Sequence, residues 1–251
     1  MRPLIISAIT FMLVFGGALC AMSFRKVIAA DHLREDVKDV VRLSTGIIGT
    51  IAALVLGLLI ASAKNSYDAR VTQFKQITTN VILLDLLLEQ YGPDAQNMRV
   101  ALRIGVPRMV ERITNEGRSG KPAPFETIPE AQRFLDRIQE LKPATEAHRA
   151  LQTRIVDAVV QLAQSRLALF TQSHESIPAP FLTILIFWLT VIFASFGLFV
   201  RPVPIVVATF VLGALSVSGA LFLILEMDQP FEGLFQISTE TLSNALSPLG
   251  N

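Results

Sequence analysis

Long uncharged stretches alternate with charged ones along this chain. Four stretches contain no Asp, Glu, Lys, Arg or His, and they cover residues 4–22, 43–63, 177–200 and 203–225. A helix needs about 20 predominantly apolar residues to cross the hydrocarbon core of a bilayer. The rest of the chain is too small to bury four such helices in a soluble core. The pattern therefore predicts four transmembrane helices, which we number spans one to four in chain order.

Span one has an alternative interpretation as a secretory signal peptide. Arg2 supplies the basic residue that precedes the apolar run, and cleavage after Cys20 or Ala21 would be required. Leu19 stands where a lipoprotein site has a small residue before the cysteine. The length of the run favours a retained membrane anchor.

The segment between spans one and two, "DHLREDVKDVVRL" at residues 31–43, has the pattern of an amphipathic helix. Asp31 can cap such a helix, and Leu33, Val37, Val40 and Val41 share one face at helical spacing. We expect it to lie at the membrane surface and lead into span two, with its nearly balanced charges in solvent.

Residues 64–176 are more polar and also follow a helical period. Apolar residues recur every three or four positions from Tyr67 to Leu88, and again from Leu151 to Leu169. No helix-breaking residue separates Ala63 from Gln90, so span two is expected to continue out of the membrane as one long helix. Gly92 and Pro93 then end it. A helix with a kink at Pro107, a loop over residues 117–124 and a shorter helix over residues 129–141 complete this middle part.

These elements predict an all-α membrane protein with four transmembrane helices and a helical bundle formed by extensions of spans two and three. The expected parts are a first transmembrane pair with its amphipathic connecting helix at residues 1–63, the polar helical bundle at 64–176, and a second transmembrane pair with a C-terminal tail at 177–251. We expect the Tyr67–Leu88 seam to pack against the Leu151–Leu169 seam, because both belong to helices that extend the membrane part.

Composition agrees with a membrane location and excludes several classes of function. The chain is 51% hydrophobic and 17% charged, whereas soluble domains carry about 25% charged residues. A net charge of +1 gives no basic field for nucleic acid. The single cysteine, Cys20, excludes an intramolecular disulfide, and the three histidines show no metal-ligand spacing. Phosphate-loop, nucleophile-elbow and metal-helix motifs are missing, so we expect neither an enzyme nor a cofactor.

Charge does not decide which side of the membrane the bundle occupies. Short loops and span ends determine orientation, with basic residues favouring the cytoplasm. Basic residues are as numerous on one side of the four spans as on the other: Arg25, Lys26, Arg34, Lys38 and Arg42 against Arg2, Lys64, Arg70, Lys75 and Arg166.

Span two carries a stripe of small residues that is the first candidate site. Its members are Gly46, Gly49, Ala53, Gly57 and Ala61. Small residues let helices approach closely, so one interpretation is a packing surface and the other is the lining of a pore. Lys64 directly follows the stripe. It is either a residue that snorkels to the interface or part of a basic ring that attracts anions.

The end of span four is the second candidate site. Glu226 and Asp228 are expected to mark the membrane exit, where a carboxylate no longer incurs the cost of the bilayer centre. Pro230 and Gly233 would then end the helix and turn the chain. The turn is either a plain helix stop or a place where the two acids pair with basic residues such as Lys64 or Arg70.

Asp85 interrupts the apolar run "VILLDLLLEQ" in the extension of span two. A buried carboxylate needs a partner. The candidates are Arg99, Arg103 and Arg154, and we expect a structural ion pair with one of them.

Two blocks of this sequence resemble the bacterial bestrophin-like domain family. They are "RLSTGIIGTIAALVLGLLIASAKNSYDARVTQFKQITTNVILLDLLLEQYGPDA" and the stretch "MDQPFEG" with the following "LFQISTETLSNAL", and the resemblance extends over roughly residues 31–250. It implies kinship with bestrophins, which are pentameric anion channels with both termini and a helical domain in the cytoplasm. The acidic calcium-binding cluster of animal bestrophins is not evident in the sequence, so calcium gating is not expected.

The resemblance and the span pattern together lead to two functional hypotheses. The first is a homo-oligomeric channel for inorganic anions in the bacterial inner membrane, with span two lining the pore and residues 64–176 in the cytoplasm. The alternative is a membrane-anchored scaffold or sensor whose helical domain binds a partner. In both, the lipid bilayer is a partner and nucleic acid is not. A membrane enzyme ranks below both hypotheses.

Overall fold

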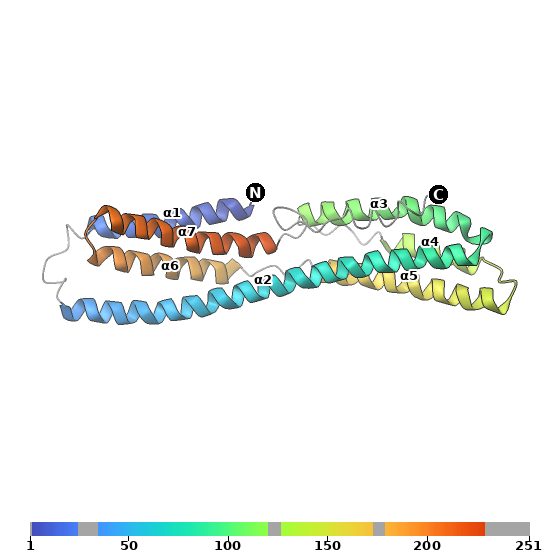
Figure 1. The fold of residues 1–251 in the computed structure, drawn as a ribbon, viewed down its shortest axis with the longest axis horizontal. Helices are drawn as coiled ribbons and strands as arrows, with labels where there is room; N and C mark the ends of the chain where they lie inside the picture. The colour runs from blue at the N-terminus through green and yellow to red at the C-terminus, as the bar shows by residue number, and fades with distance from the viewer. Residues whose placement is uncertain (1, 25–34, 120–126, 173–178, 229–251) are drawn as a thin grey trace. The chain divides into compact units, whose positions relative to one another are not determined.

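The computed structural model describes residues 2–24, 35–119, 127–172 and 179–228. Within these ranges the chain forms seven α-helices and one short 3-10 helix, with no strand. The helices are α1 (Arg2–Phe24), α2 (Glu35–Tyr91), α3 (Gln96–Ser119), α4 (Thr127–Gln139), α5 (Glu146–Gln172), α6 (Ala179–Phe199) and α7 (Pro204–Met227), with η2 (Pro93–Ala95) between α2 and α3. Figure 1 shows this order along the chain.

Four of the described helices, α1, α2, α6 and α7, are long and apolar enough to cross a membrane. This result confirms the prediction of an all-α membrane protein with four such helices. The prediction of one long helix is confirmed as well, because α2 runs without interruption from Glu35 to Tyr91. Residues 35–43 form the first turns of α2 and are therefore continuous with the apolar stretch, while residues 31–34 lie outside the described part.

The chain divides into two compact units, and α2 contributes to both. The first unit contains α1, the beginning of α2, α6 and α7, within Met1–Asn65 and Ser176–Asp228. In this unit α1 lies against both α6 and α7. Its core consists of buried residues from all four helices: Val14, Ala52, Leu59, Ala63, Leu185, Leu189, Ile192, Ala214, Leu221 and Ile224.

Hydroxyl side chains inside the first unit are satisfied by their own helices. The buried Ser7 and Thr10 donate to the carbonyl oxygens of Pro3 and Ile6, at 2.8 and 2.9 Å. Ser218 on α7 does the same with Ala214, at 2.6 Å. Each hydroxyl donates four residues back, so a polar group is buried without an unmade hydrogen bond.

The second unit lies within Ser66–Glu175 and contains the rest of α2 with α3, α4 and α5. At the end of α2 the chain reverses through Gly92, whose φ of 101° falls in a region that favours glycine, and Pro93 begins the 3-10 helix. On α5, Thr145 caps the helix by accepting a hydrogen bond from the backbone N–H of His148 at 3.2 Å. Pro107 lies inside α3 without ending it.

One apolar cluster fills the second unit and joins the two predicted seams. Phe74, Ile77, Val81, Leu84 and Leu88 of α2 belong to the same buried cluster as Ile155, Ala158 and Leu169 of α5. Asn80 Nδ2 also donates to Ser165 Oγ at 3.1 Å, which links the two helices directly. The predicted packing of the two seams is therefore confirmed.

Candidate functional site

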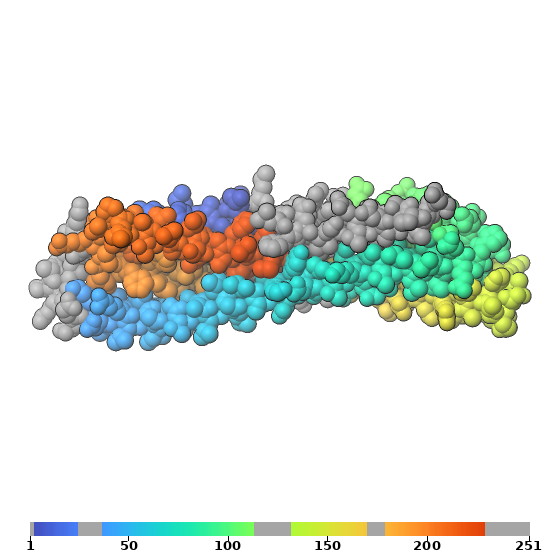
Figure 2. Space-filling model, viewed as in Figure 1, coloured from blue at the N-terminus to red at the C-terminus, as the bar shows by residue number. Residues whose placement is uncertain are grey.

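The small-residue stripe of α2 lies on an open face of the first unit. Gly46, Ala53, Gly57 and Ala61 are exposed, and Gly49 is half-buried. A β-carbon added at Gly46 or Gly57 would meet no atom within 4 Å, and one added at Gly49 would lie 4.0 Å from Ile192 Cδ1. Figure 2 shows the first part of α2 at the surface of this unit. Among the described residues of the chain, the stripe is therefore not a close packing surface.

A different strip of α2 packs inward. Thr45, Ala52, Leu59 and Ala63 are buried, and the last three belong to the core of the first unit. Leu43, Ile47, Leu54 and Leu58 are between 64% and 71% exposed. The apolar part of α2 thus uses a narrow strip for its own chain and leaves both leucines and small residues on the outside.

The close helix contacts of the first unit use glycines outside the small-residue stripe of α2. A β-carbon at Gly197 of α6 would overlap the carbonyl oxygen of Ala18 on α1. One at Gly17 would lie 3.0 Å from Thr190 Cγ2, and one at Gly213 would lie 3.0 Å from Phe193 Cζ. The signal was present in the small pair Gly16–Gly17 and in a lone glycine within the aromatic-rich α6. Their spacing, however, does not show which helix they face.

Lys64 is exposed and follows the buried Ala63 at the end of the apolar part of α2. Its position agrees with either predicted role, because a snorkelling residue and a member of a basic ring both keep the ammonium group in water.

The predicted membrane-exit turn is described only in its first half. Glu226 is 6% exposed and lies in the last turn of α7. Asp228 follows as the C-cap with helical backbone angles. Helix α7 continues to Met227, so Glu226 is buried within its last turn, and the role of the two acids at the membrane exit stays a prediction. Pro230 and Gly233 lie outside the described residues, and pairing of the acids with Lys64 or Arg70 stays a prediction.

Asp85 is the centre of a charged cluster in the second unit. Its side chain is fully buried, and Arg99 Nε lies 3.1 Å from both carboxylate oxygens while Arg99 Nη2 lies 3.0 Å from Oδ2. Arg103 Nε is 3.5 Å from Asp85 Oδ1, and Glu89 Oε2 is 3.0 Å from Arg99 Nη2. The hydrogen bond to Asp85 raises the pKa of Arg99. The predicted structural ion pair is confirmed with Arg99 and Arg103, which tie α3 to α2; Arg154 is exposed on α5.

The same ion pairs fix how α2 and α3 are aligned, and this alignment brings exposed apolar residues of the two helices together. Asp85 and Arg99 face each other, and α2 and α3 run in opposite directions. The residues that follow them, Leu86 and Val100, therefore lie on the same side of the helix pair. We call Leu83, Leu86, Val100 and Ile104 the α2–α3 apolar patch. Each is between 42% and 53% exposed, although this unit is the polar part of the chain.

Among the described residues, no group of three or more His, Cys, Asp and Glu side chains is close enough together to hold a metal ion. The candidate site is a surface of the first unit. It consists of the open face of α2 in the first unit, ending at Lys64.

Comparison with known proteins assigns this arrangement to a family. No curated protein and no solved structure matches the chain. A family model described as "Bestrophin-like domain" matches residues 11–242, which include the greater part of α1 and all of the helices α2 to α7. The match covers most of the sequence, and it agrees with the resemblance of the two sequence blocks. The chain is a membrane protein that belongs to the Bestrophin-like family.

Proposed function

We propose that this protein is a homo-oligomeric channel for inorganic anions, in which α1, α2, α6 and α7 cross the membrane and α2 faces the pore. The observation that carries the proposal is the open small-residue face of α2. Membership of the Bestrophin-like family supports it, because the name implies kinship with anion channels.

The open face suits contact with further copies and a pore better than contact with lipid. Because no side chain here is larger than a methyl group, Gly46, Ala53 and Gly57 allow neighbouring helices to approach closely. The same surface can line a narrow, uncharged conduit, because the apolar stretch at residues 43–63 contains no ionisable side chain. An oligomer built around α2 would therefore use a strip of small residues that the described part of the chain leaves open.

Lys64 gives the proposed pore its preference for anions. One copy from each subunit would form a basic ring at the polar end of the apolar helices, and such a ring raises the local concentration of anions. Four crossings place this end and the second unit on the same side of the membrane. By kinship with bestrophins, that side is the cytoplasmic face of a bacterial inner membrane.

The test is anion flux through purified protein in liposomes. Wild-type protein is expected to conduct, and Lys64→Glu should reduce anion flux or shift selectivity toward cations while expression is unchanged. Lys75→Glu is the matched control. Lys75 is an exposed lysine of the same helix that lies 11 residues further on, about 16 Å away along the axis and thus about two Debye lengths at physiological salt.

Two results would contradict the channel. One is wild-type liposomes that pass no ions under any tested condition, and the other is a protein that remains a monomer in mild detergent. If Lys64→Glu and Lys75→Glu changed anion flux equally, the basic ring at Lys64 would be wrong, whereas the proposed oligomer would be unaffected.

The α2–α3 apolar patch favours a second candidate, a membrane-anchored scaffold whose helical unit binds a protein partner. Exposed apolar surface on a water-facing domain marks interaction sites. A photo-crosslinking residue at Ile104 should then capture one discrete partner in cells, whereas the same residue at Val160, an exposed position on α5, should not. The scaffold replaces the channel as the proposed function if the crosslinked product forms at Ile104 and liposomes with the wild-type protein do not conduct.

A further inference from the structure

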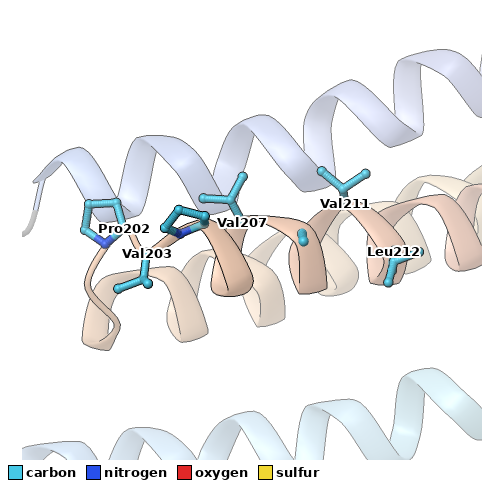
Figure 3. A pocket seen from close by; sticks show the side chains of 7 residues that line it. Pro202, Val203, Val207, Val211 and Leu212 are labelled. Carbon is cyan, nitrogen blue, oxygen red and sulfur yellow. The ribbon is translucent and has the colours of Figure 1, made fainter.

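A shallow apolar groove runs along the N-terminal half of α7. It is lined by Pro202, Val203, Pro204, Val207, Ala208, Val211 and Leu212, and its volume is about 720 Å³. This volume falls within the range of about 300–1,000 Å³ that is usual for ligand pockets. Figure 3 shows the labelled side chains along the α7 ribbon and the turn before it. The lining contains no charged and no hydroxyl side chain.

Ala208 forms the floor of this groove. Residues three and four positions apart are neighbours on a helix surface. The lining residues Pro204, Val211 and Leu212 therefore surround Ala208, and each is larger than alanine. Ala208 itself is exposed, and Leu212 on one flank is 64% exposed. The groove thus opens outward from the first unit, where a membrane protein meets lipid.

The length of the groove matches one leaflet of a bilayer. Val203 and Leu212 are nine residues apart, which corresponds to about 14 Å at 1.5 Å per residue. The hydrocarbon core of a bilayer is about 30 Å thick, so one leaflet contributes about 15 Å. Because the groove begins at the helix end and runs toward the helix centre, an extended acyl chain that enters from the surface would follow it over its own leaflet.

Arg201 lies immediately before the groove. It is exposed in the turn between α6 and α7, and it is the one charged residue of the sequence between Ala179 and Leu225. Pro202 and Pro204 follow it and restrict the backbone of the turn. A guanidinium group at this level faces lipid phosphates and pairs well with them, since its planar donors can bind two phosphate oxygens.

We propose that the groove binds an anionic phospholipid, with one acyl chain over Ala208 and the phosphate group on Arg201. The two features are complementary, because the groove is apolar along its length and basic at its mouth. The site is independent of ion conduction, since it lies on α7 and uses no residue of the proposed pore.

The experiment is native mass spectrometry of delipidated, purified protein, titrated with phosphatidylglycerol and with phosphatidylcholine of the same acyl chains. Wild-type protein should bind phosphatidylglycerol more tightly. A basic residue near the membrane surface contributes about 1 kcal/mol toward anionic lipid, or about fivefold in affinity. Arg201→Gln should therefore lower the affinity for phosphatidylglycerol about fivefold and leave that for phosphatidylcholine unchanged. Arg42→Gln, at another exposed arginine, should change neither.

The groove itself is tested with Ala208→Trp, whose indole ring would fill it. This variant should lose the tightly bound lipid of both kinds. Leu215→Trp is the control, since Leu215 is exposed seven residues further along the same helix and lies beyond the groove. Both positions are on the outside, so both variants should keep the wild-type melting temperature, and Ala208→Leu provides a milder filling if the larger one does not fold.

Three outcomes would overturn the proposal. Equal binding of the two lipids by wild-type protein would show that Arg201 selects nothing. Undiminished lipid binding by both Ala208 variants would show that the bound lipid is ordinary annular lipid and does not occupy the groove. Loss of the oligomer in Ala208→Trp with unchanged lipid binding would show that a second copy of the chain covers the groove.

Discussion

The two units of this protein use the same helical period and both bury an apolar core, but they expose different surfaces. In the first unit, large apolar side chains such as Met12, Leu54 and Ile205 are among the most exposed, and Gly197 leaves no room for a β-carbon against the backbone of Ala18. In the second unit, Ile77, Leu84 and Leu88 are buried. Helix α2 belongs to both units, so the difference does not come from the kind of element. The surroundings of each part therefore decide which side chains its outer face can carry.

The units also differ in how they bury polar groups. The first unit contains hydroxyls that donate to their own helix, as Thr10 does to Ile6, and these groups connect no two elements. The second unit buries the carboxylate of Asp85 against arginines of another helix. In water-facing parts such a cluster can fix which helices pair, whereas helices in lipid depend on close packing.

The largest expected effect tests the apolar core of the second unit. Leu84→Asp should destabilise this unit by about 4 kcal/mol or more, because it places an unpaired charge at a position that is 1% exposed. The matched control is Leu83→Asp at the neighbouring exposed position, where the cost should stay below about 1 kcal/mol. Thermal unfolding of the full chain in detergent, together with limited proteolysis of the second unit, measures both. Similar stability of the two variants would show that the seam is not buried.

The next effect tests the charged cluster. Asp85→Ala should cost about 3–5 kcal/mol, because it removes the carboxylate between two arginines and leaves their charges poorly compensated. Glu89→Ala, at the partner whose side chain is 54% exposed, should cost less than about 1 kcal/mol. Chemical denaturation of the full chain gives both values. A cost for Glu89→Ala equal to that for Asp85→Ala would mean that the surface member, and not the buried one, organises the cluster.

The sequence predicted the helices well because each unit follows a strong local rule. Uncharged runs of membrane length placed α1, α6 and α7 within a few residues of their ends, and the absence of breakers before Gly92 predicted the continuous α2. Asp85 also carried its own signal, since a carboxylate in an apolar run requires a basic partner. The choice among Arg99, Arg103 and Arg154 depended on how α3 is aligned with α2, which no local pattern contains.

Contacts between distant helices could not be predicted in the same way. The stripe from Gly46 to Ala61 and the glycines Gly17 and Gly197 look alike in sequence, yet only the latter two are at close contacts within the described chain. Glu226 is buried, and this burial depends on where α7 ends and on what lies beside it. Such features follow from three-dimensional register and not from spacing.

A smaller effect tests the close packing of the first unit. Gly197→Ala should cost about 1–3 kcal/mol, since the added methyl group overlaps the backbone of α1 at Ala18 and the two helices must move apart. Gly219→Ala on α7 is the control. A β-carbon there meets no atom within 4 Å, and its effect should be neutral or stabilising by up to about 1 kcal/mol. Melting temperatures in detergent separate the two. Equal tolerance of both changes would contradict the tight α1–α6 crossing.

The smallest effect concerns Tyr91, at the end of α2. Its ring stacks on His148 at a centroid distance of 5.0 Å, and its hydroxyl oxygen is buried with no hydrogen-bond partner among the described groups. Burial raises the pKa of Tyr91 above its usual value of 10.0, and Asp94 adds to the rise. Tyr91→Phe keeps the stacked ring and removes the unpaired hydroxyl. It should therefore be neutral or stabilising by up to about 1 kcal/mol near neutral pH.

The pH dependence of stability provides a second test of the buried Tyr91 hydroxyl. The folded state favours the neutral phenol of Tyr91. The contribution of this preference to the free energy of unfolding is fully present below pH 10, and it is lost as the pH rises through the raised pKa of the folded state. Wild-type stability should therefore fall more steeply above pH 10 than that of Tyr91→Phe, and the two should run parallel below it. Melting temperatures at pH 8 and at pH values above 10 measure the difference. A Tyr91→Phe protein that is clearly less stable at pH 8 would show that the hydroxyl does have a partner, and the second unit would then bury one more satisfied polar group.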